Sequence, residues 1–390
     1  MMALYLLVAL AGAAPLSADQ AVAAALIRSP ERAEAEAEVT RAEGALRAAT
    51  GLPGDPRLSA SVAAVGEAWS LSVAQPLSLT GEGLAERTAA QRTADAAAAR
   101  LTRAGLVVAA DTRRAWIDAV VSRQRAALAD EALAVATRIE AAAAQRAAAG
   151  DASQLDLLMA RLQAEEARTH WMIAVVEEGR SAADLAARVG VDLAELELPR
   201  DPLAGAPSPS GDHAAPRSDV EAAAATVEAA HAALARERAG TLPPLQVGAF
   251  VEQEGSELRA GPTLSITVPI WRGNADGRAA ARADLSLVEA QRDDATRRAG
   301  TERDAAARIN EKLEVALADQ GSEIPAAARA ALDSVALGYD RGELDLLSAA
   351  LLQAQILEGY VAWVEGRGLV AGARLDWMLA VEDARLLGEP

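Results

Sequence analysis

The residue types that most often carry catalysis are few in this chain and far apart. It holds three histidines (His170, His213 and His231), one lysine and no cysteine. A metal site built on imidazoles or thiolates needs several of these ligands in one place, and a disulfide needs two cysteines. The lysine, Lys312, lies in NEKLEV and does not follow a glycine-rich turn, so a P-loop is excluded. The sequence therefore predicts no bound metal, no cofactor and no disulfide.

Motifs and net charge exclude further classes of function. The sequence has no Gly-x-Ser-x-Gly, His-Glu-x-x-His or Gly-x-Gly-x-x-Gly motif, so we expect no enzyme. The sequence contains 38 Lys and Arg residues and 56 Asp and Glu residues, which gives a net charge of −18. Nucleic acids and anionic membrane surfaces bind basic faces, so neither is an expected partner.

The N-terminus resembles a targeting segment. An apolar run over 3–14 ends in small residues, as in a secretory signal peptide, and is too short to span a bilayer as a helix. We expect a signal peptide at 1–14. The alternative is a buried N-terminal helix.

The chain repeats itself at an offset near half its length. LSVAQPLSLTGEG (Leu71–Gly83) returns as LSITVPIWRGNADG (Leu264–Gly277), with Leu71 and Leu264 193 residues apart. AGDASQLDLLMA (Ala149–Ala160) returns as DRGELDLLSA (Asp340–Ala349). A third pair of phrases, Arg41–Pro53 and Glu228–Pro244, keeps the same order. We therefore expect two repeats, 15–197 and 217–390, joined by a proline-rich loop at 198–216.

Each repeat is expected to contain two short strands. The candidates, 57–65, 69–77, 245–252 and 264–268, alternate apolar with small or polar residues. This pattern fits half-buried strands of a soluble sheet or transmembrane β-strands. Four strands cannot close a barrel, so strands that enter a membrane would have to be pooled from several copies of the chain.

Long helices are expected on either side of the strands. The sequence predicts a helix over 18–50 and another over 83–149, which would be about 100 Å long at 1.5 Å per residue. A heptad-like seam on the second helix comprises Ile117, Val121, Leu128, Val135 and Ile139. The second repeat is expected to follow the same layout: helix, two strands, very long helix, turn, long helix. A soluble coiled-coil scaffold is the competing architecture.

This order of elements, with the Gly-x-x-Ser/Thr-x-Leu-Asp-x-Leu-x-Ala turn, resembles the outer-membrane factor family of TolC-like exit ducts. TVPIWRGNADGRAAARADL and EIPAAARAALDSVALGYDRGEL are most similar to its cobalt–zinc–cadmium efflux branch. The resemblance implies a mainly α fold with a small β part, built as a homotrimer. Its twelve strands would form a transmembrane β-barrel in the outer membrane, continued by a long α-helical barrel across the periplasm.

The resemblance also implies partners and site residues. The duct would serve a periplasmic adaptor and an inner-membrane pump, or a type I secretion apparatus. The residues that match the adaptor-facing turns are Gly150, Ser153, Leu155, Asp156, Tyr339, Gly342, Leu344 and Asp345. In the alternative interpretation the glycines only turn the chain and the aspartates cap helices.

Two further hypotheses concern charged residues at these turns. Asp340 and Arg341 are a candidate gate element. Acidic rings from Asp151, Asp156, Glu343 and Asp345, with the negative net charge, would favour cations in the duct.

Trp69 and Trp271 are candidates for the membrane interface or for ordinary packing.

Overall fold

A computed structural model describes residues 15–50, 56–62, 68–77, 81–192, 197–199, 201–207, 216–239, 245–266, 274–321 and 323–388. The expected signal peptide at 1–14, Trp271 and much of the 198–216 loop lie outside these residues. The chain forms two compact units, and each combines segments of both sequence halves. The first unit comprises Met1–Pro30, Gly105–Ala215 and Glu302–Pro390, and the second comprises Glu31–Ala104 and Pro216–Thr301.

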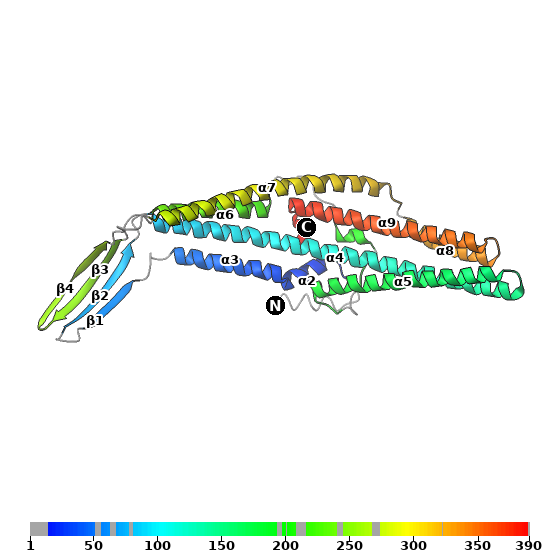
Figure 1. Cartoon of the computed structure of the whole chain (residues 1–390), viewed down its shortest axis with the longest axis horizontal. Coiled ribbons are helices and arrows are strands. Elements are labelled where there is room, and N and C mark those ends of the chain that lie inside the picture. Colours follow the sequence, from blue (N-terminus) through cyan, green and yellow to red (C-terminus); the bar gives the residue numbers. More distant parts are fainter. Residues whose placement is uncertain are drawn as a thin grey trace. The chain divides into compact units, whose positions relative to one another are not determined.

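The first unit is built from helices, and two helical hairpins dominate it (Figure 1). One hairpin joins α4 (Glu82–Ala149) to α5 (Gln154–Val189), and the other joins α8 (Ile324–Asp340) to α9 (Leu346–Val381). The shorter elements of this unit are α2 (Ala18–Arg28), η2 (Pro202–Gly205) and η3 (Ala384–Leu387).

The expected helix over 83–149 is confirmed as α4, with 68 residues. Ile117, Leu128, Val135 and Ile139 of its seam are buried, and Val121 packs against the core beside them. The seam residues belong to two apolar clusters. One cluster includes residues of α2, α5 and the end of α9, and the other includes residues of α8 and the start of α9. Among the described helices, none is both long enough and apolar enough to cross a membrane.

The prediction of one helix over 18–50 is wrong, because Pro30 divides it. α2 ends at Arg28, Ser29 is extended (φ −61°, ψ 123°), and α3 runs over Pro30–Ala49. Proline lacks a backbone N–H and pushes the preceding residue out of the α region, but it fits the first position of a helix.

The second repeat departs from the expected layout in the same way. Its long helix is interrupted: α7 (Ala275–Ala318) ends, and α8 begins only at Ile324. Pro325 occupies the first turn of α8, where its missing N–H costs no helical hydrogen bond. The expected second repeat therefore contains two helices where the expected first repeat contains one.

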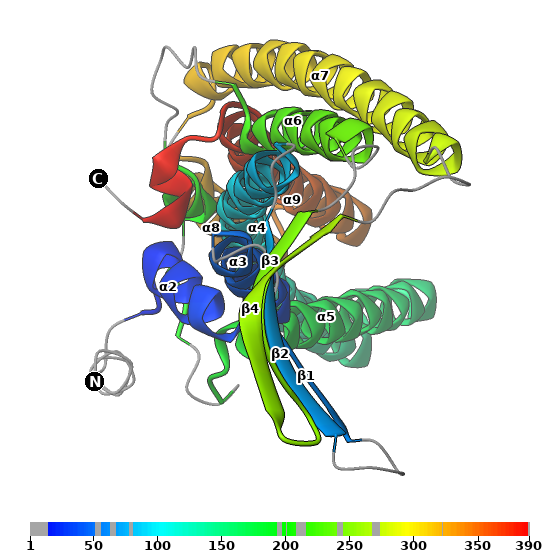
Figure 2. The ribbon, with the colours of Figure 1, turned by 90° about the vertical axis from the view of Figure 1, so that its left-hand side faces the viewer.

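The second unit holds a four-stranded antiparallel sheet in the order β1 (Arg57–Val62), β2 (Ala68–Leu77), β3 (Leu245–Glu254), β4 (Glu257–Ile266). Figure 2 shows the strands as one twisted ribbon. The central pair, β2 with β3, joins the two sequence halves. The unit also contains α3, α6 (Ser218–Ala239) and parts of α4 and α7.

The strand predictions are confirmed in number and order, with one error of extent. β4 begins at Glu257, seven residues before the expected start at 264, and it contains Gly261 and Pro262. Both residues weaken a strand signal, yet proline is tolerated at a sheet edge, where β4 lies. Residues 63–65 of the first expected strand lie outside the described residues.

Candidate functional site: the paired helical turns and the apolar sheet face

The first turn connects α4 to α5 through a left-handed glycine and a capping box. Gly150 has φ +84°, a region that glycine enters without steric cost. Ser153 caps α5: its hydroxyl accepts from the Asp156 N–H at 3.1 Å, and its own N–H donates to the Asp156 carboxylate at 2.9 Å. These hydrogen bonds from Ser153 hold the pKa of Asp156 below its usual range, and the nearby Arg146 adds to the effect.

The second turn connects α8 to α9 by different contacts. The N–H groups of Glu343 and Leu344 donate to the Gly338 carbonyl at 2.8 and 3.1 Å, around the left-handed Gly342 (φ +71°). Asp345 caps α9 by accepting from the Ser348 N–H at 2.6 Å. Hydrogen bonds from Ser348 lower the pKa of Asp345.

Side chains from both hairpins meet beneath the turns. Tyr339 of α8 is buried in the apolar cluster, and the Arg146 guanidinium of α4 lies 5.4 Å from its ring centroid. Burial raises the pKa of the Tyr339 hydroxyl. The Asp345 charge also acts on Asp156, in the direction of a higher pKa. The structure thus brings the two sequence-predicted turns into one site.

The two turns are not equivalent in detail, although both contain Leu-Asp-Leu-Leu. The sequence repeat aligns Asp156 with Asp345, yet Asp345 is itself the N-cap of α9, whereas Asp156 is the third residue of α5 and Ser153 is its cap. Gly150 and Gly342 turn the chain in the left-handed conformation, and Asp156 and Asp345 both take part in capping. Contact of these turns with an adaptor stays a prediction.

Sequence reasoning missed Arg146 and Ser348. Ser348 could have been found, because it follows Asp345 at the N-cap to N3 spacing. Arg146 has no such signal, since its partner Tyr339 is far away in sequence.

The remaining turn residues are accessible. Leu155 is 66% exposed, Leu344 is half-buried, and Asp151 and Glu343 are exposed. Asp340 and Arg341 are exposed and form no ion pair with any residue that the structure describes.

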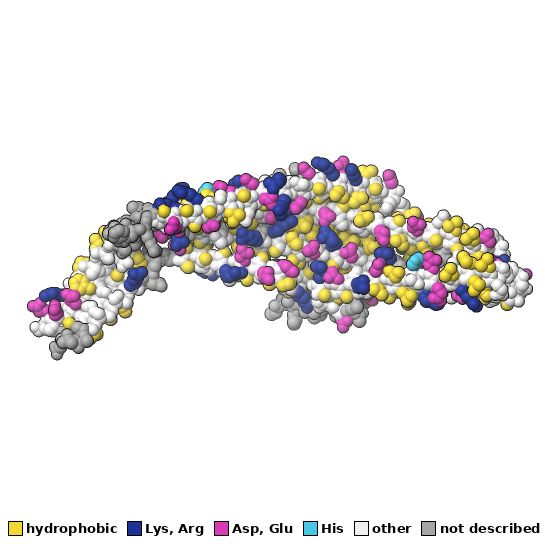
Figure 3. Space-filling model, in the orientation of Figure 1, with side chains coloured by type: hydrophobic (Ala, Val, Ile, Leu, Met, Phe, Trp, Pro, Cys, Tyr) yellow, Lys and Arg dark blue, Asp and Glu magenta, His cyan; other side chains and the backbone are white. Residues whose placement is uncertain are grey.

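Helices behind the turns also leave large apolar side chains uncovered. Hydrophobic side chains are visible on the molecular surface in Figure 3. On α5 and α9 the exposed ones include Leu158, Leu162, Ile173, Val176, Leu347 and Leu351. Contiguous exposed apolar surface is typical of an interaction site.

In the second unit, one face of the sheet is apolar and uncovered. The register aligns Leu58 with Val73 and Val62 with Trp69, so alternate residues of neighbouring strands share a face. The large exposed apolar residues of this face are Leu58, Val62, Trp69, Leu71, Val73, Leu77, Val247, Leu258, Leu264 and Ile266. The opposite face is mostly polar or small, with Phe250 as an exception, and carries the Ser61–Ser70 hydroxyl hydrogen bond of 2.8 Å.

Trp69 lies on the apolar face, and its indole N–H donates to the Gln253 side chain at 3.0 Å. Both outer strands, β1 and β4, have one edge without a partner strand in the described part of the chain. Open edges invite pairing with strands of another chain. Over the described residues, no group of three His, Asp or Glu side chains is arranged to hold a metal ion.

No protein-family model and no curated protein matches the sequence. The fold, however, is similar to solved outer-membrane channels. The outer membrane protein VceC of Vibrio cholerae is 19% identical over 93% of this chain and 95% of its own, with a TM-score of 0.77. The Campylobacter jejuni CmeC outer membrane channel is 15% identical over 93% and 85%, with a TM-score of 0.78.

A third structure, CusC, was solved in work on conformational changes that accompany folding and transmembrane channel formation. It is 15% identical over 94% of this chain and 92% of its own, with a TM-score of 0.76. These similarities confirm the expected fold class, mainly α with a small four-stranded sheet. At such identities the likeness is one of fold.

Proposed function

We propose that this chain is one protomer of an outer-membrane exit duct, a passive channel through which a tripartite efflux system releases small molecules or metal cations. The observation that carries the proposal is the sheet, whose apolar face is uncovered and whose two edges are open. It occurs in a chain with the fold of outer-membrane channels. Assignment to the cobalt–zinc–cadmium branch rests on the sequence resemblance and is part of the proposal.

The open edges give a physical reason for an oligomer. In hydrocarbon every backbone N–H and C=O must be hydrogen-bonded, so a four-stranded sheet cannot lie there alone. In a homotrimer, β1 of one copy would pair with β4 of the next, pooling three sets of four strands into a twelve-stranded barrel. The Leu71 face would meet lipid and the Ser70 face the lumen. Neighbouring copies would also cover exposed leucines of α5 and α9.

The paired turns are the proposed contact with a periplasmic adaptor, which would connect the duct to an inner-membrane pump. Capping and glycine geometry fix both turns, so an adaptor would meet a preformed surface. Leu155 supplies exposed apolar area at this surface. Asp340 and Arg341 are the proposed gate, because each is free of described ion-pair partners and can pair across a subunit boundary.

The acidic character of the chain leads to a proposal about the lumen. With a net charge of −18, the field in the duct is expected to favour cations. Single-channel reversal potentials in a salt gradient test this, and a preference for anions would contradict it. Co-purification of a type I secretion apparatus instead of an efflux pump would assign the same duct to protein export.

The decisive experiment measures membrane partitioning and mass together. The chain is expressed with its N-terminal segment, and the outer-membrane fraction is washed with carbonate. The protein is then extracted in detergent, and native mass spectrometry measures the mass of the extracted complex. We expect a carbonate-resistant trimer. A soluble monomer or dimer would overturn the proposal and favour the coiled-coil scaffold.

A matched pair of variants tests the face of the sheet. Leu71→Asp places a carboxylate on the apolar face, and Ser70→Asp places one on the opposite face of the same strand. A charge on a lipid-facing strand position near the bilayer midplane costs about 2–4 kcal/mol for Arg or Lys and less for Asp, whereas lumen positions tolerate charge. We expect Leu71→Asp to reduce the trimer in the outer membrane and Ser70→Asp to leave it unchanged. Equal effects would contradict the assignment of faces.

A further inference from the structure

The first unit contains a cavity of about 570 Å³ that neither the turns nor the sheet explains. One face of each of three helices lines it: α4 through Arg123 and Glu131, α8 through Arg329, and α9 through Trp363 and neighbouring residues. Leu198, Pro199 and Asp201 line another side. Cavities of this size, with aromatic walls and a few polar groups, are typical of small-molecule sites.

Two aromatic rings give the cavity a rigid apolar wall. Tyr360 is 5% exposed, and its ring centroid lies 6.0 Å from that of Trp363 at an interplanar angle of 33°. The Trp363 indole N–H donates to the Gly321 carbonyl at 3.2 Å, which fixes the ring. The Arg367 guanidinium lies 5.0 Å from the centroid of Trp363. A planar ligand could lie against this wall.

The charged side chains of the wall sum to +1 over the described residues, in contrast to the negative charge of the chain as a whole. Three guanidinium groups, of Arg123, Arg329 and Arg367, face two carboxylates, of Glu131 and Asp201. Arg329 forms an ion pair with Glu131: its Nε lies 3.0 and 3.2 Å from the two carboxylate oxygens. The cavity is therefore a locally basic site in a protein with a net charge of −18.

Arg123 and Arg367 retain donor capacity. Arg367 donates from Nη2 to Asp201 at 2.9 Å, while its Nε is buried without a hydrogen-bond partner. Arg123 makes one long contact, 3.4 Å from Nη1 to the Leu198 carbonyl. A buried N–H donor without a partner is costly, and guanidinium groups bind carboxylates with two parallel hydrogen bonds. An acceptor with negative charge would use these donors.

From these contacts we infer that the cavity binds a small aromatic carboxylate, with its ring against Trp363 and Tyr360 and its carboxylate at Arg367 and Arg123. The site lies within one unit of one chain and does not depend on the proposed duct function. The excess of guanidinium over carboxylate groups disfavours a cationic ligand.

Isothermal titration calorimetry on the purified full chain in detergent tests the inference, with 2-naphthoate as the probe and neutral 2-naphthamide as its comparator. We expect saturable binding of 2-naphthoate, one per chain, at least tenfold tighter than that of 2-naphthamide. No saturable binding at millimolar probe, or equal binding of both compounds, would overturn the inference.

Variants locate the binding in this cavity. Arg367→Gln should weaken 2-naphthoate binding at least tenfold. Arg374→Gln is the matched control, because Arg374 lies on the same helix, is paired to Glu314 at 2.5 Å and does not line the cavity. Trp363→Leu removes the stacking surface and should weaken both probes. If Arg367→Gln binds like the parent, or if Arg374→Gln loses as much affinity, the probe binds elsewhere and the assignment is wrong.

Discussion

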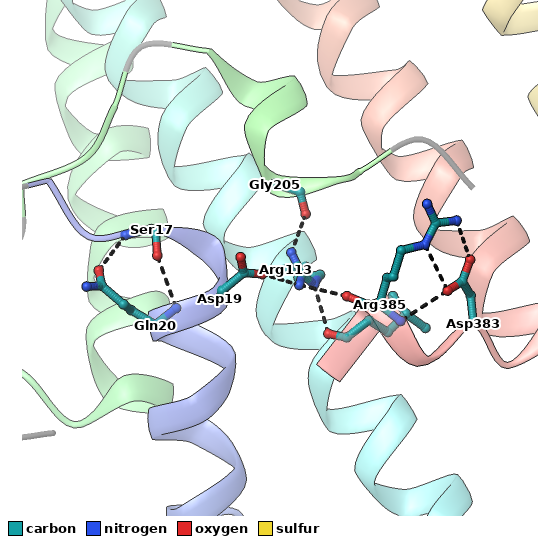
Figure 4. A network of polar contacts seen from close by, with 8 residues as sticks. Ser17, Asp19, Gln20, Arg113, Gly205, Asp383 and Arg385 are labelled. Carbon is teal, nitrogen blue, oxygen red and sulfur yellow. Dashed lines mark hydrogen bonds and ion pairs between the residues drawn. The ribbon is translucent and has the colours of Figure 1, made fainter. Parts of the chain in front are cut away.

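The buried guanidinium of Arg113 leads to a prediction that can be worked out from its contacts. Arg113 lies on α4 with 1% of its side chain exposed and donates to three backbone carbonyls: Leu386 at 2.9 Å, Arg385 at 3.0 Å and Gly205 at 3.1 Å (Figure 4). A fourth hydrogen bond goes to the Asp19 carboxylate of α2. One side chain thus connects α2, η2 and η3 to α4.

Replacing Arg113 by methionine keeps much of the volume but removes every donor. The Arg385 carbonyl still accepts from the Gly388 N–H at 3.2 Å, so only the Leu386 and Gly205 carbonyls lose their partner. Each buried carbonyl left without a partner costs about 1–3 kcal/mol, and removal of the buried charge offsets part of the sum. Asp19 adds little, because its side chain is 64% exposed and exposed ion pairs contribute about 0–1 kcal/mol. We expect the free energy of local opening to fall by about 3 kcal/mol, which raises the population of the open state on the order of 100-fold.

Hydrogen exchange of the intact protein, followed by mass spectrometry on peptides that contain η2 and η3, measures this opening. Arg113→Met should accelerate exchange in both segments by about 100-fold. Arg114→Gln is the matched control, since the adjacent Arg114 is 41% exposed and pairs with Asp111 and Asp376. It should change exchange by less than about fivefold. Exchange in Arg113→Met within twofold of the parent, or equal acceleration in both variants, would refute the reasoning.

Three further predictions concern the turns and the core behind them. The folded-state pKa of Asp156 is lowered, so its contribution to stability is complete above its ordinary pKa of 3.8 and is lost as pH falls through the folded-state value. The start of α5 should therefore open in acid, and Asp156→Asn should abolish that pH dependence in exchange data corrected for intrinsic rates. Gly342→Ala should lower the free energy of unfolding by about 1 kcal/mol, because φ at this position is +71°. Gly300→Ala should raise it by about 0.5–1 kcal/mol, because Gly300 lies within α7 with open space at Cβ. Chemical denaturation measures both changes. Leu332→Ala, at 2% exposure in the core of α8, should lower the denaturation midpoint by the equivalent of roughly 2–5 kcal/mol, and a change below about 1 kcal/mol would contradict its assignment to the core.

Local patterns in the sequence were sufficient for most elements. The period-two alternation over 69–77 and the long run of helix formers over 83–149 determine β2 and α4, because side-chain direction follows from backbone geometry alone. The turns at Gly150 and Gly342 were predictable for the same reason. Pro30 and Pro325 also acted locally, and the expected helices were wrong at these positions because they ran through the prolines. The repeat boundaries themselves stay a prediction.

The arrangement of distant side chains was decided only by the tertiary structure. Arg113 bonds to carbonyls 92 and 273 residues away, and Arg146 lies over Tyr339 of another hairpin. The cavity around Arg367 likewise combines three helices and the Asp201 segment. No periodicity or motif encodes such contacts, because they depend on how the helices pack and not on the residues beside each partner. The sequence by itself therefore determined the strands, the long helix and the turns, while packing determined which charges are buried, which turns meet and which apolar faces stay uncovered.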